Sequence, residues 1–148
     1  MAIQIIDYAF DPYQEIQHYQ SIQLEHLGAI GATSLFIGTM RDFNQGSQVT
    51  GMSIEHYPGM TEKQLGLCVE KAQGLWSILD SLIIHRVGTI TPNEVIVLIA
   101  VWSAHRGDAF DATELLLTIG YWSLVCGIAL TIVGLFAFMV STGFFDGA

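Results

Sequence analysis

Positive charge and cysteine are both scarce in this sequence. Its 148 residues include five lysines and arginines against fourteen aspartates and glutamates, so the formal net charge is −9. This balance argues against a nucleic-acid partner, because nucleic acids bind to basic faces. The two cysteines, Cys68 and Cys126, lie far apart and form no C-x-x-C motif, so neither a disulfide framework nor a zinc site is indicated. Their scarcity agrees with a reducing compartment, and we expect a cytoplasmic protein.

Patterns typical of a secreted protein or of a metalloenzyme are missing as well. The residues that follow Met1 contain no basic segment leading into a long apolar one, so a signal peptide is not indicated. Five histidines are present, but none of them form an H-x-x-x-H or H-E-x-x-H motif. Only His105 adjoins an expected pocket. We therefore expect no bound metal and no permanently bound cofactor.

One long apolar run is present near the end of the chain. Residues 115–145 include no charged side chain, and residues 121–140 alone provide the ~20 apolar residues that a helix needs to cross a bilayer. This pattern predicts a transmembrane-like helix and, through residues 115–145, a contact with a membrane. A buried helix or hairpin is one alternative, and a foreign or frame-shifted segment joined near Thr113 is another. We accordingly divide the chain into a domain at 1–113 and an apolar tail at 114–148.

Before residue 113, segments typical of strands alternate with segments typical of helices. Asp11 and Pro12 are typical of an N-cap and a first helical residue, and Thr61 with Gln64 resembles a capping box. Cys68 falls on the apolar side of the second helix, so we interpret it as a core residue rather than a nucleophile. Helices between hairpin-like strand pairs predict an α+β fold with a mostly antiparallel sheet. The expected strands are residues 3–10, 32–39, 49–57, 81–87 and 94–102, and the expected helices are residues 12–26, residues 61–76 and a helix from residue 108.

The end of the last expected strand is suited to binding an anion. Ser103 and Ala104 lead into His105 and Arg106, and a helix is expected to follow. An imidazole beside a guanidinium offers several donors to a phosphate, and a helix N-terminus adds unpaired N–H groups. Two more arginines also lie close to expected strand ends, so that all three could converge. A surface arginine beside a structural histidine is the alternative interpretation.

Four stretches, taken together, resemble one family, that of the large catalytic subunit of molybdopterin synthase, MoaE. Their order and spacing agree with that family over about residues 3–112, whereas the tail does not match it. The resemblance implies an α/β-hammerhead fold with packed helices. It also implies a homodimer at the core of a heterotetramer with a small, ubiquitin-like subunit, MoaD. The stretches are Gly31-Ala32-Thr33-Ser34-Leu35-Phe36-Ile37-Gly38-Thr39-Met40-Arg41-Asp42, Glu55-His56-Tyr57-Pro58-Gly59-Met60-Thr61-Glu62-Lys63, His85-Arg86-Val87-Gly88, and Ser103-Ala104-His105-Arg106 with Ala109-Phe110.

The same resemblance implies a reaction. The family transfers sulfur from a thiocarboxylate at the C-terminal Gly-Gly of MoaD to cyclic pyranopterin monophosphate. Two transfers make the dithiolene of molybdopterin, a step of molybdenum cofactor biosynthesis. Cations that hold the phosphate and a positioned acid, base or amine are needed for each transfer. The residues that match the family's substrate-binding part are Arg41, His105 and Arg106, and those that match its wall are Phe36, Thr39 and Met40.

The chain departs from the family where two catalytic lysines are expected. In outline the family carries K-x-x-x-P-x-W-K after the last helix, and the first of these lysines would fall near Tyr121. No lysine follows Lys71 in this sequence, so no catalytic residue is assigned. Loss of one electrostatic or proton-transfer group typically costs ~10²-fold or more in rate, so we expect impaired turnover. The alternative function is that of a non-catalytic or membrane-tethered binding module.

Overall fold

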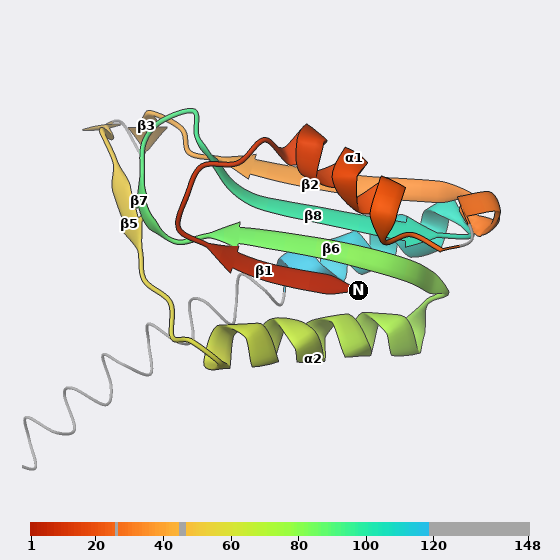
Figure 1. The fold of residues 1–148 in the computed structure, drawn as a ribbon. Helices are drawn as coiled ribbons and strands as arrows, with labels where there is room; N and C mark the ends of the chain where they lie inside the picture. Colours follow the sequence, from red (N-terminus) through yellow and green to blue (C-terminus); the bar gives the residue numbers. More distant parts are fainter. Residues whose placement is uncertain (26, 45–46, 119–148) are drawn as a thin grey trace, which may run out of the picture.

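A single four-stranded sheet forms the centre of the molecule. The computed structural model describes residues 1–25, 27–44 and 47–118 (Figure 1). The strands lie in the order β1-β6-β8-β2, with β1 parallel to β6 and the other two pairs antiparallel. This arrangement confirms the α+β class and the mostly antiparallel sheet. The strand bounds are β1 Ala2–Ile6, β2 Ala32–Thr39, β6 Ile78–Arg86 and β8 Val95–Ser103.

Helices cover both faces of this sheet. Helix α1, Pro12–Ile22, packs on one face, where the Tyr19 ring stacks on Trp102 with ring centroids 5.4 Å apart. Helix α2, Met60–Leu75, and a helix over residues 106–118 share the other face. Cys68 belongs to the core of that second face, which confirms its interpretation as a core residue. Strand β8 lies between β6 and β2, and helices cover both of its faces. Its near-continuous apolar sequence follows from this burial on both faces.

The start of α1 agrees with the sequence analysis. The Asp11 carboxylate accepts hydrogen bonds from the N–H groups of Tyr13 and Gln14, at 2.9 and 3.3 Å, and Pro12 is the first helical residue. The helix ends at Ile22, four residues before the expected end at residue 26. Its last turn is closed by the Gln23 N–H, which donates to the Tyr19 carbonyl.

The start of α2 differs from the sequence analysis. The expected capping box of Thr61 and Gln64 is wrong, because the helix begins at Met60 and the capping residue is Gly59. Gly59 has a φ of 81°, a backbone conformation that glycine adopts without strain. Its N–H donates to the Glu62 carboxylate at 2.7 Å, so the reciprocal contact comes from Glu62 instead.

Short strands form two small accessory sheets. Strand β3, Phe43–Asn44, pairs with β4, Ser47–Gln48, in the segment between the strands expected at residues 32–39 and 49–57. Strand β5, Met52–Ile54, pairs with β7, Gly88–Ile90. The strand expected at residues 49–57 is therefore much shorter, because β7 offers only three residues for pairing. In Figure 1, β3, β5 and β7 lie beyond one end of the main sheet.

The last described helix begins earlier than expected. It starts at residue 106 rather than 108, because the His105 carbonyl already accepts a hydrogen bond from the Ala109 N–H. The helix crosses the expected domain boundary at residue 113, and Leu116 is buried in the core beside α2. The transmembrane-like segment expected at residues 121–140 lies outside the described residues. In the part of the chain that is described, no helix is both long and apolar enough to span a bilayer.

Candidate functional site

The residues expected to bind substrate lie at opposite ends of the main sheet. Strands β2 and β8 are antiparallel, so Arg41 after β2 and His105 after β8 leave the sheet in opposite directions. The Gly31 N–H donates to the Ser103 carbonyl at one end of this ladder, and the Met40 N–H donates to the Glu94 carbonyl at the other. Residues 31 and 40 are separated by about 30 Å at ~3.3 Å per residue.

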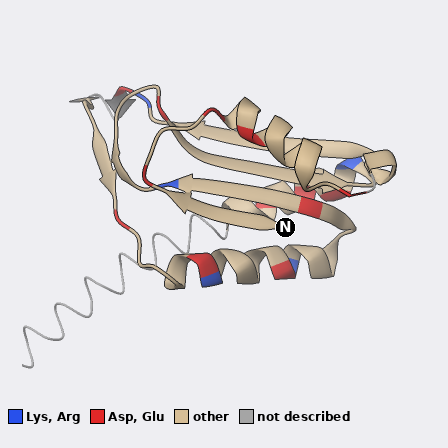
Figure 2. Cartoon of the chain, in the orientation of Figure 1, with Lys and Arg blue, Asp and Glu red and all other residues tan. Residues whose placement is uncertain are grey.

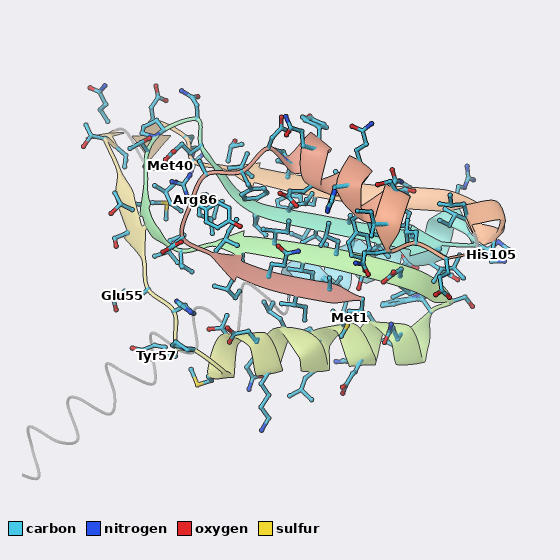
Figure 3. All side chains as sticks on the ribbon, in the orientation of Figure 1. Met1, Met40, Glu55, Tyr57, Arg86 and His105 are labelled. Carbon is cyan, nitrogen blue, oxygen red and sulfur yellow. The ribbon has the colours of Figure 1, made fainter. Side chains whose placement is uncertain are left out.

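The expected convergence of the three arginines is therefore wrong within one chain. Arg41 and Arg86 belong to one end of the sheet, and Arg106 belongs to the other. Figure 3 shows the same separation between Met40 and Arg86 on one side and His105 on the other. Figure 2 accordingly shows basic positions at both ends of the sheet rather than in one cluster. We call the two regions the Arg41 end, with Met40, Arg41, Arg86 and residues 89–94, and the His105 end, with Gly31, Ser77 and residues 103–108.

A buried serine shapes the His105 end. The Ser103 side chain is fully buried, donates to the Ser77 carbonyl at 2.9 Å and accepts from the His105 N–H at 3.2 Å. The Asp108 carboxylate accepts from the Ser77 N–H at 3.2 Å, which ties the helix start to the segment before β6. These bonds turn the chain from β8 into the helix and leave His105 and Arg106 exposed.

Gly31 is required at the same end for steric reasons. A Cβ atom at residue 31 would lie 2.1 Å from the Ala104 carbonyl oxygen, a distance that real atoms do not adopt. The start of the first family-like stretch thus touches the turn in the last one, although 70 or so residues separate them, and only glycine permits the contact. No local sequence pattern marks this requirement, because the close approach depends on the pairing of β2 with β8.

The chemistry of the His105 end favours an anion. In a helix that begins at residue 106, the first-turn N–H groups have no acceptor within the helix and carry the positive end of the helix dipole. The Arg106 guanidinium and the His105 imidazole are exposed beside these groups. A phosphate at this position would accept backbone and side-chain hydrogen bonds together.

The Arg41 end combines an exposed arginine with a buried support. Arg41 is exposed, whereas Met40 before it retains 5% of its surface. Phe36 and Thr39, expected in the wall of the site, are both exposed on β2. The Phe36 ring lies over Gly38, where a Cβ atom would come within 3.3 Å of it. Phe36, Thr39 and Arg41 are thus accessible on one strand and its continuation, whereas Met40, also expected in the wall, is buried.

Arg86 is an internal residue and not a free anion ligand. Its side chain is buried, at 6% exposure, and its Nη1 lies 3.1 Å from the Glu94 Oε1 atom. Its Nη2 donates to the Thr89 carbonyl at 3.3 Å. The Glu94 carboxylate accepts a hydrogen bond from the Thr91 N–H, and this bond lowers the pKa of Glu94 below its ordinary value. The Arg86 guanidinium lowers it further. This ion pair is not evident from the sequence, because the partner of Arg86 comes from the turn after β7.

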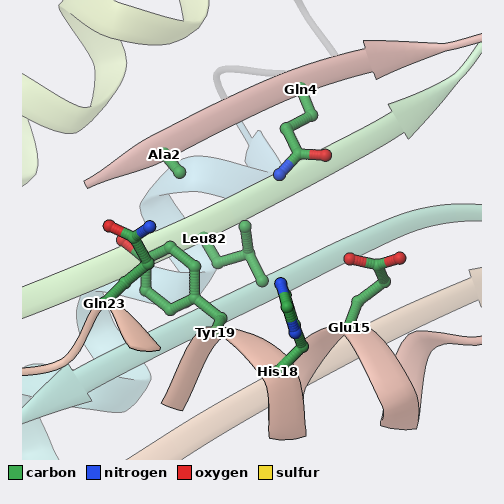
Figure 4. Close-up of a pocket in the computed structure, with 7 residues that line it drawn as sticks. All are labelled: Ala2, Gln4, Glu15, His18, Tyr19, Gln23 and Leu82. Atoms are coloured by element: carbon green, nitrogen blue, oxygen red, sulfur yellow. The ribbon is translucent and has the colours of Figure 1, made fainter. Parts of the chain in front are cut away.

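Two further features are separate from both ends of the sheet. A hollow lies between α1 and the strands β1 and β6, and none of the expected site residues line it (Figure 4). The residues around the hollow are Ala2, Gln4, Glu15, His18, Tyr19, Gln23 and Leu82.

Burial raises the pKa of the Cys68 thiol, which argues against a thiolate nucleophile at this position.

Comparison with known proteins identifies the family. The profile of the MoaE family, described as MoaE protein, matches residues 10–118. The chain belongs to the MoaE family. It is 47% identical over 112 residues to the molybdopterin synthase catalytic subunit of Pseudomonas aeruginosa, a match that covers 76% of this chain and 72% of that protein. It is 54% identical over 88 residues to the molybdopterin synthase catalytic subunit of Ralstonia nicotianae, and this match spans 60% of the chain and half of that relative.

A solved MoaE-type structure has the same fold. The molybdopterin cofactor biosynthesis protein E of Burkholderia multivorans superposes with a TM-score of 0.68 and 36% sequence identity. The superposition covers 80% of this chain and 75% of that protein. The MoaE resemblance inferred from four short stretches is therefore confirmed. The MoaE profile and the described helix both end at residue 118, so the tail after it lies outside both.

Proposed function

We propose that this MoaE-family chain is the large subunit of a molybdopterin synthase. In this role it transfers sulfur from a C-terminal thiocarboxylate of a small MoaD-type subunit to cyclic pyranopterin monophosphate. The observation that carries the proposal is the family match over residues 10–118, which includes Arg41, His105 and Arg106 as exposed residues. The relatives are named catalytic subunits, and such a name implies a second subunit that completes the enzyme.

The positions of these side chains support the proposal of a homodimer. One small substrate cannot contact Arg41 and Arg106 of the same chain across about 30 Å of sheet. Both can reach it when two chains contribute, with Arg41 from one protomer and His105 and Arg106 from its partner. A two-fold dimer would contain two such composite sites, because each protomer supplies both halves. Two small subunits would then complete a heterotetramer.

The exposed groups suit the proposed chemistry. Arg106 and the helix start would bind the phosphate of the substrate, and Arg41 would stabilise negative charge from the other side. The exposed His105 imidazole can form a hydrogen bond to the substrate through its ring nitrogens. In each transfer the thiocarboxylate sulfur forms a bond to a side-chain carbon of the pterin, and the bond from that carbon to its oxygen substituent breaks, with the oxygen leaving as water or with the phosphate group. Water then cleaves the bond between the sulfur and the acyl carbon, so that the small subunit leaves as a carboxylate.

The missing lysines favour a second candidate function, substrate binding without efficient turnover. Lys63 and Lys71, the only lysines of the sequence, both lie on α2 and match no catalytic position of the family. An ammonium that assists sulfur transfer is therefore not supplied by this chain. The binding groups are nevertheless retained at Arg41, His105 and Arg106.

One reconstitution experiment tests both functions. The purified chain is mixed with thiocarboxylated small subunit and cyclic pyranopterin monophosphate, and molybdopterin is measured by mass spectrometry while substrate affinity is measured by calorimetry. We expect measurable binding and at least ~10²-fold less product than the Pseudomonas aeruginosa relative makes. Turnover equal to that relative would contradict the impairment. The absence of substrate binding would contradict the proposed function itself.

A further inference from the structure

We propose that Arg86 is a positioning residue that acts through Glu94 to hold Met40 and thereby orient Arg41. This proposal rests on the proposed function, because it gives Arg86 a role in substrate binding without contact to substrate. Arg86 is buried at the end of β6, whereas Arg41 is exposed after β2. Figure 3 shows Arg86 and Met40 at the same end of the sheet.

The first link of this support is a buried guanidinium. Arg86 Nη1 lies 3.1 Å from Glu94 Oε1, and Nη2 donates to the Thr89 carbonyl at 3.3 Å. Its Nε atom has no hydrogen-bond partner among the described residues. A buried guanidinium needs a nearby anion, so the Arg86 side chain depends on Glu94. Little of its surface remains for a ligand, which excludes a direct contact with substrate in this arrangement.

The second link joins Glu94 to the turn between β7 and β8. Its Oε2 atom accepts from the Thr91 N–H at 2.6 Å, and its own N–H donates to the Thr91 carbonyl at 3.1 Å. Asn93, inside this turn, has a φ of 71°, which asparagine tolerates better than most residues. The two oxygens of one carboxylate thus bridge the Arg86 side chain and the backbone of the turn.

The third link joins the turn to Met40. The Met40 N–H donates to the Glu94 carbonyl at 2.9 Å, and the Asn93 N–H donates to the Met40 carbonyl at 2.8 Å. Both backbone groups of Met40 are therefore held by the turn. The Met40 carbonyl belongs to the peptide bond with Arg41, so the direction in which Arg41 leaves the sheet depends on this pair of bonds. The register of β2 on β8 also shifts between Gly38 and Thr39, an irregularity that redirects the strand just before Met40.

The test compares variants that break the ion pair with a matched control. Arg86→Gln and Glu94→Gln each remove one charge of the pair, Arg86→Lys keeps the charge but not the two-pronged geometry, and Glu70→Gln alters an exposed glutamate on α2. The first readout needs no ligand. Hydrogen exchange of the Met40 and Asn93 amides and the NMR signal of the Arg41 side chain are measured in the full-length chain.

The second readout is the affinity for cyclic pyranopterin monophosphate, alone and in combination with Arg41→Ala. We expect the Met40 and Asn93 amides to exchange at least about tenfold faster in Glu94→Gln and the Arg41 signal to shift, with no change in Glu70→Gln. We expect substrate affinity to fall about tenfold through misplacement of Arg41, and no further fall when Arg41 is already alanine.

Two outcomes would overturn the proposal. One is unchanged exchange of the Met40 and Asn93 amides in Glu94→Gln and Arg86→Lys. The other is an equal loss of affinity whether or not Arg41 is present, which would show that Arg86 acts on the fold alone. If Arg86→Gln does not fold, the Glu94→Gln and Arg86→Lys variants decide. If the unaltered chain binds no substrate, the proposed function fails, and the amide exchange and Arg41 signal still decide the positioning role.

Discussion

The two ends of the main sheet hold their exposed functional groups by different physical means. At the His105 end, a steric contact at Gly31 and the buried hydroxyl of Ser103 set the path of the backbone. At the Arg41 end, an ion pair between the buried Arg86 guanidinium and the partly exposed Glu94 carboxylate sets it. The steric contact and the Ser103 hydrogen bonds involve no charged group, so the His105 end should respond mainly to side-chain volume. The Arg41 end should respond to charge and pH, because it depends on an ion pair. Different substitutions should therefore perturb the two halves of one proposed site independently.

The largest effect is expected for Gly31→Ala. The new Cβ atom would lie 2.1 Å from the Ala104 carbonyl oxygen, so β2 and the turn before His105 have to move apart. We expect a loss of about 3 kcal/mol or more in the free energy of unfolding, as for overpacked sites. Urea unfolding monitored by circular dichroism measures it. Gly28→Ala is the matched control, because nothing lies within 4 Å of a Cβ atom there. Equal stability of the two variants would contradict a steric His105 end.

A smaller effect is expected for Ser103→Ala. This change removes the donor to the Ser77 carbonyl and the acceptor of the His105 N–H, so it should cost ~1–3 kcal/mol in the free energy of unfolding. Ser81→Ala is the control, because the Ser81 hydroxyl is also fully buried but has no hydrogen-bond partner among the described residues. Its removal should be neutral or stabilising. Equal losses in both variants would show that burial alone, and not the Ser103 hydrogen bonds, supports this end.

The smallest effect is expected from His85, which precedes Arg86 at the Arg41 end. Burial lowers the pKa of His85 from its ordinary value of 6.5, with a further contribution from His56. The unfolded chain therefore binds a proton at a higher pH than the folded chain, and stability should decrease as pH falls below 6.5. His85→Gln should reduce this pH dependence in thermal unfolding scans, and His18→Gln, at an exposed residue of α1, is the control substitution. A pH dependence that persists without His85 would assign it to other groups.

Local sequence signals predicted local structure well. Strand β2 has the expected bounds, because an apolar β-rich segment lies between Gly31 and a polar stretch. Asp11 and Pro12 begin α1 as expected, since a cap acts on its nearest neighbours. The cap of α2 was assigned to Thr61 instead of Gly59, because a glycine at positive φ provides no side-chain signal.

Long-range relations were predicted less well. Strand ends can be recognised in a sequence, but the direction in which neighbouring strands pair decides whether their ends meet. The antiparallel pairing of β2 with β8 separates Arg41 from Arg106. The burial of Arg86 was missed for a related reason, because Glu94 reaches it only after the chain has turned through β7. Family resemblance named the site residues but did not say which of them come from one chain.

In the proposed homodimer, one site combines Arg41 of one protomer with His105 and Arg106 of its partner. The most direct measurement mixes Arg41→Ala and Arg106→Ala chains, allows subunits to exchange, and titrates cyclic pyranopterin monophosphate. Each variant alone should bind little. After random exchange about half of the dimers are mixed, and each mixed dimer has one intact site and one doubly altered site. The mixture should therefore regain about a quarter of the sites. A mixture that binds no better than the separate variants would contradict the two-protomer site.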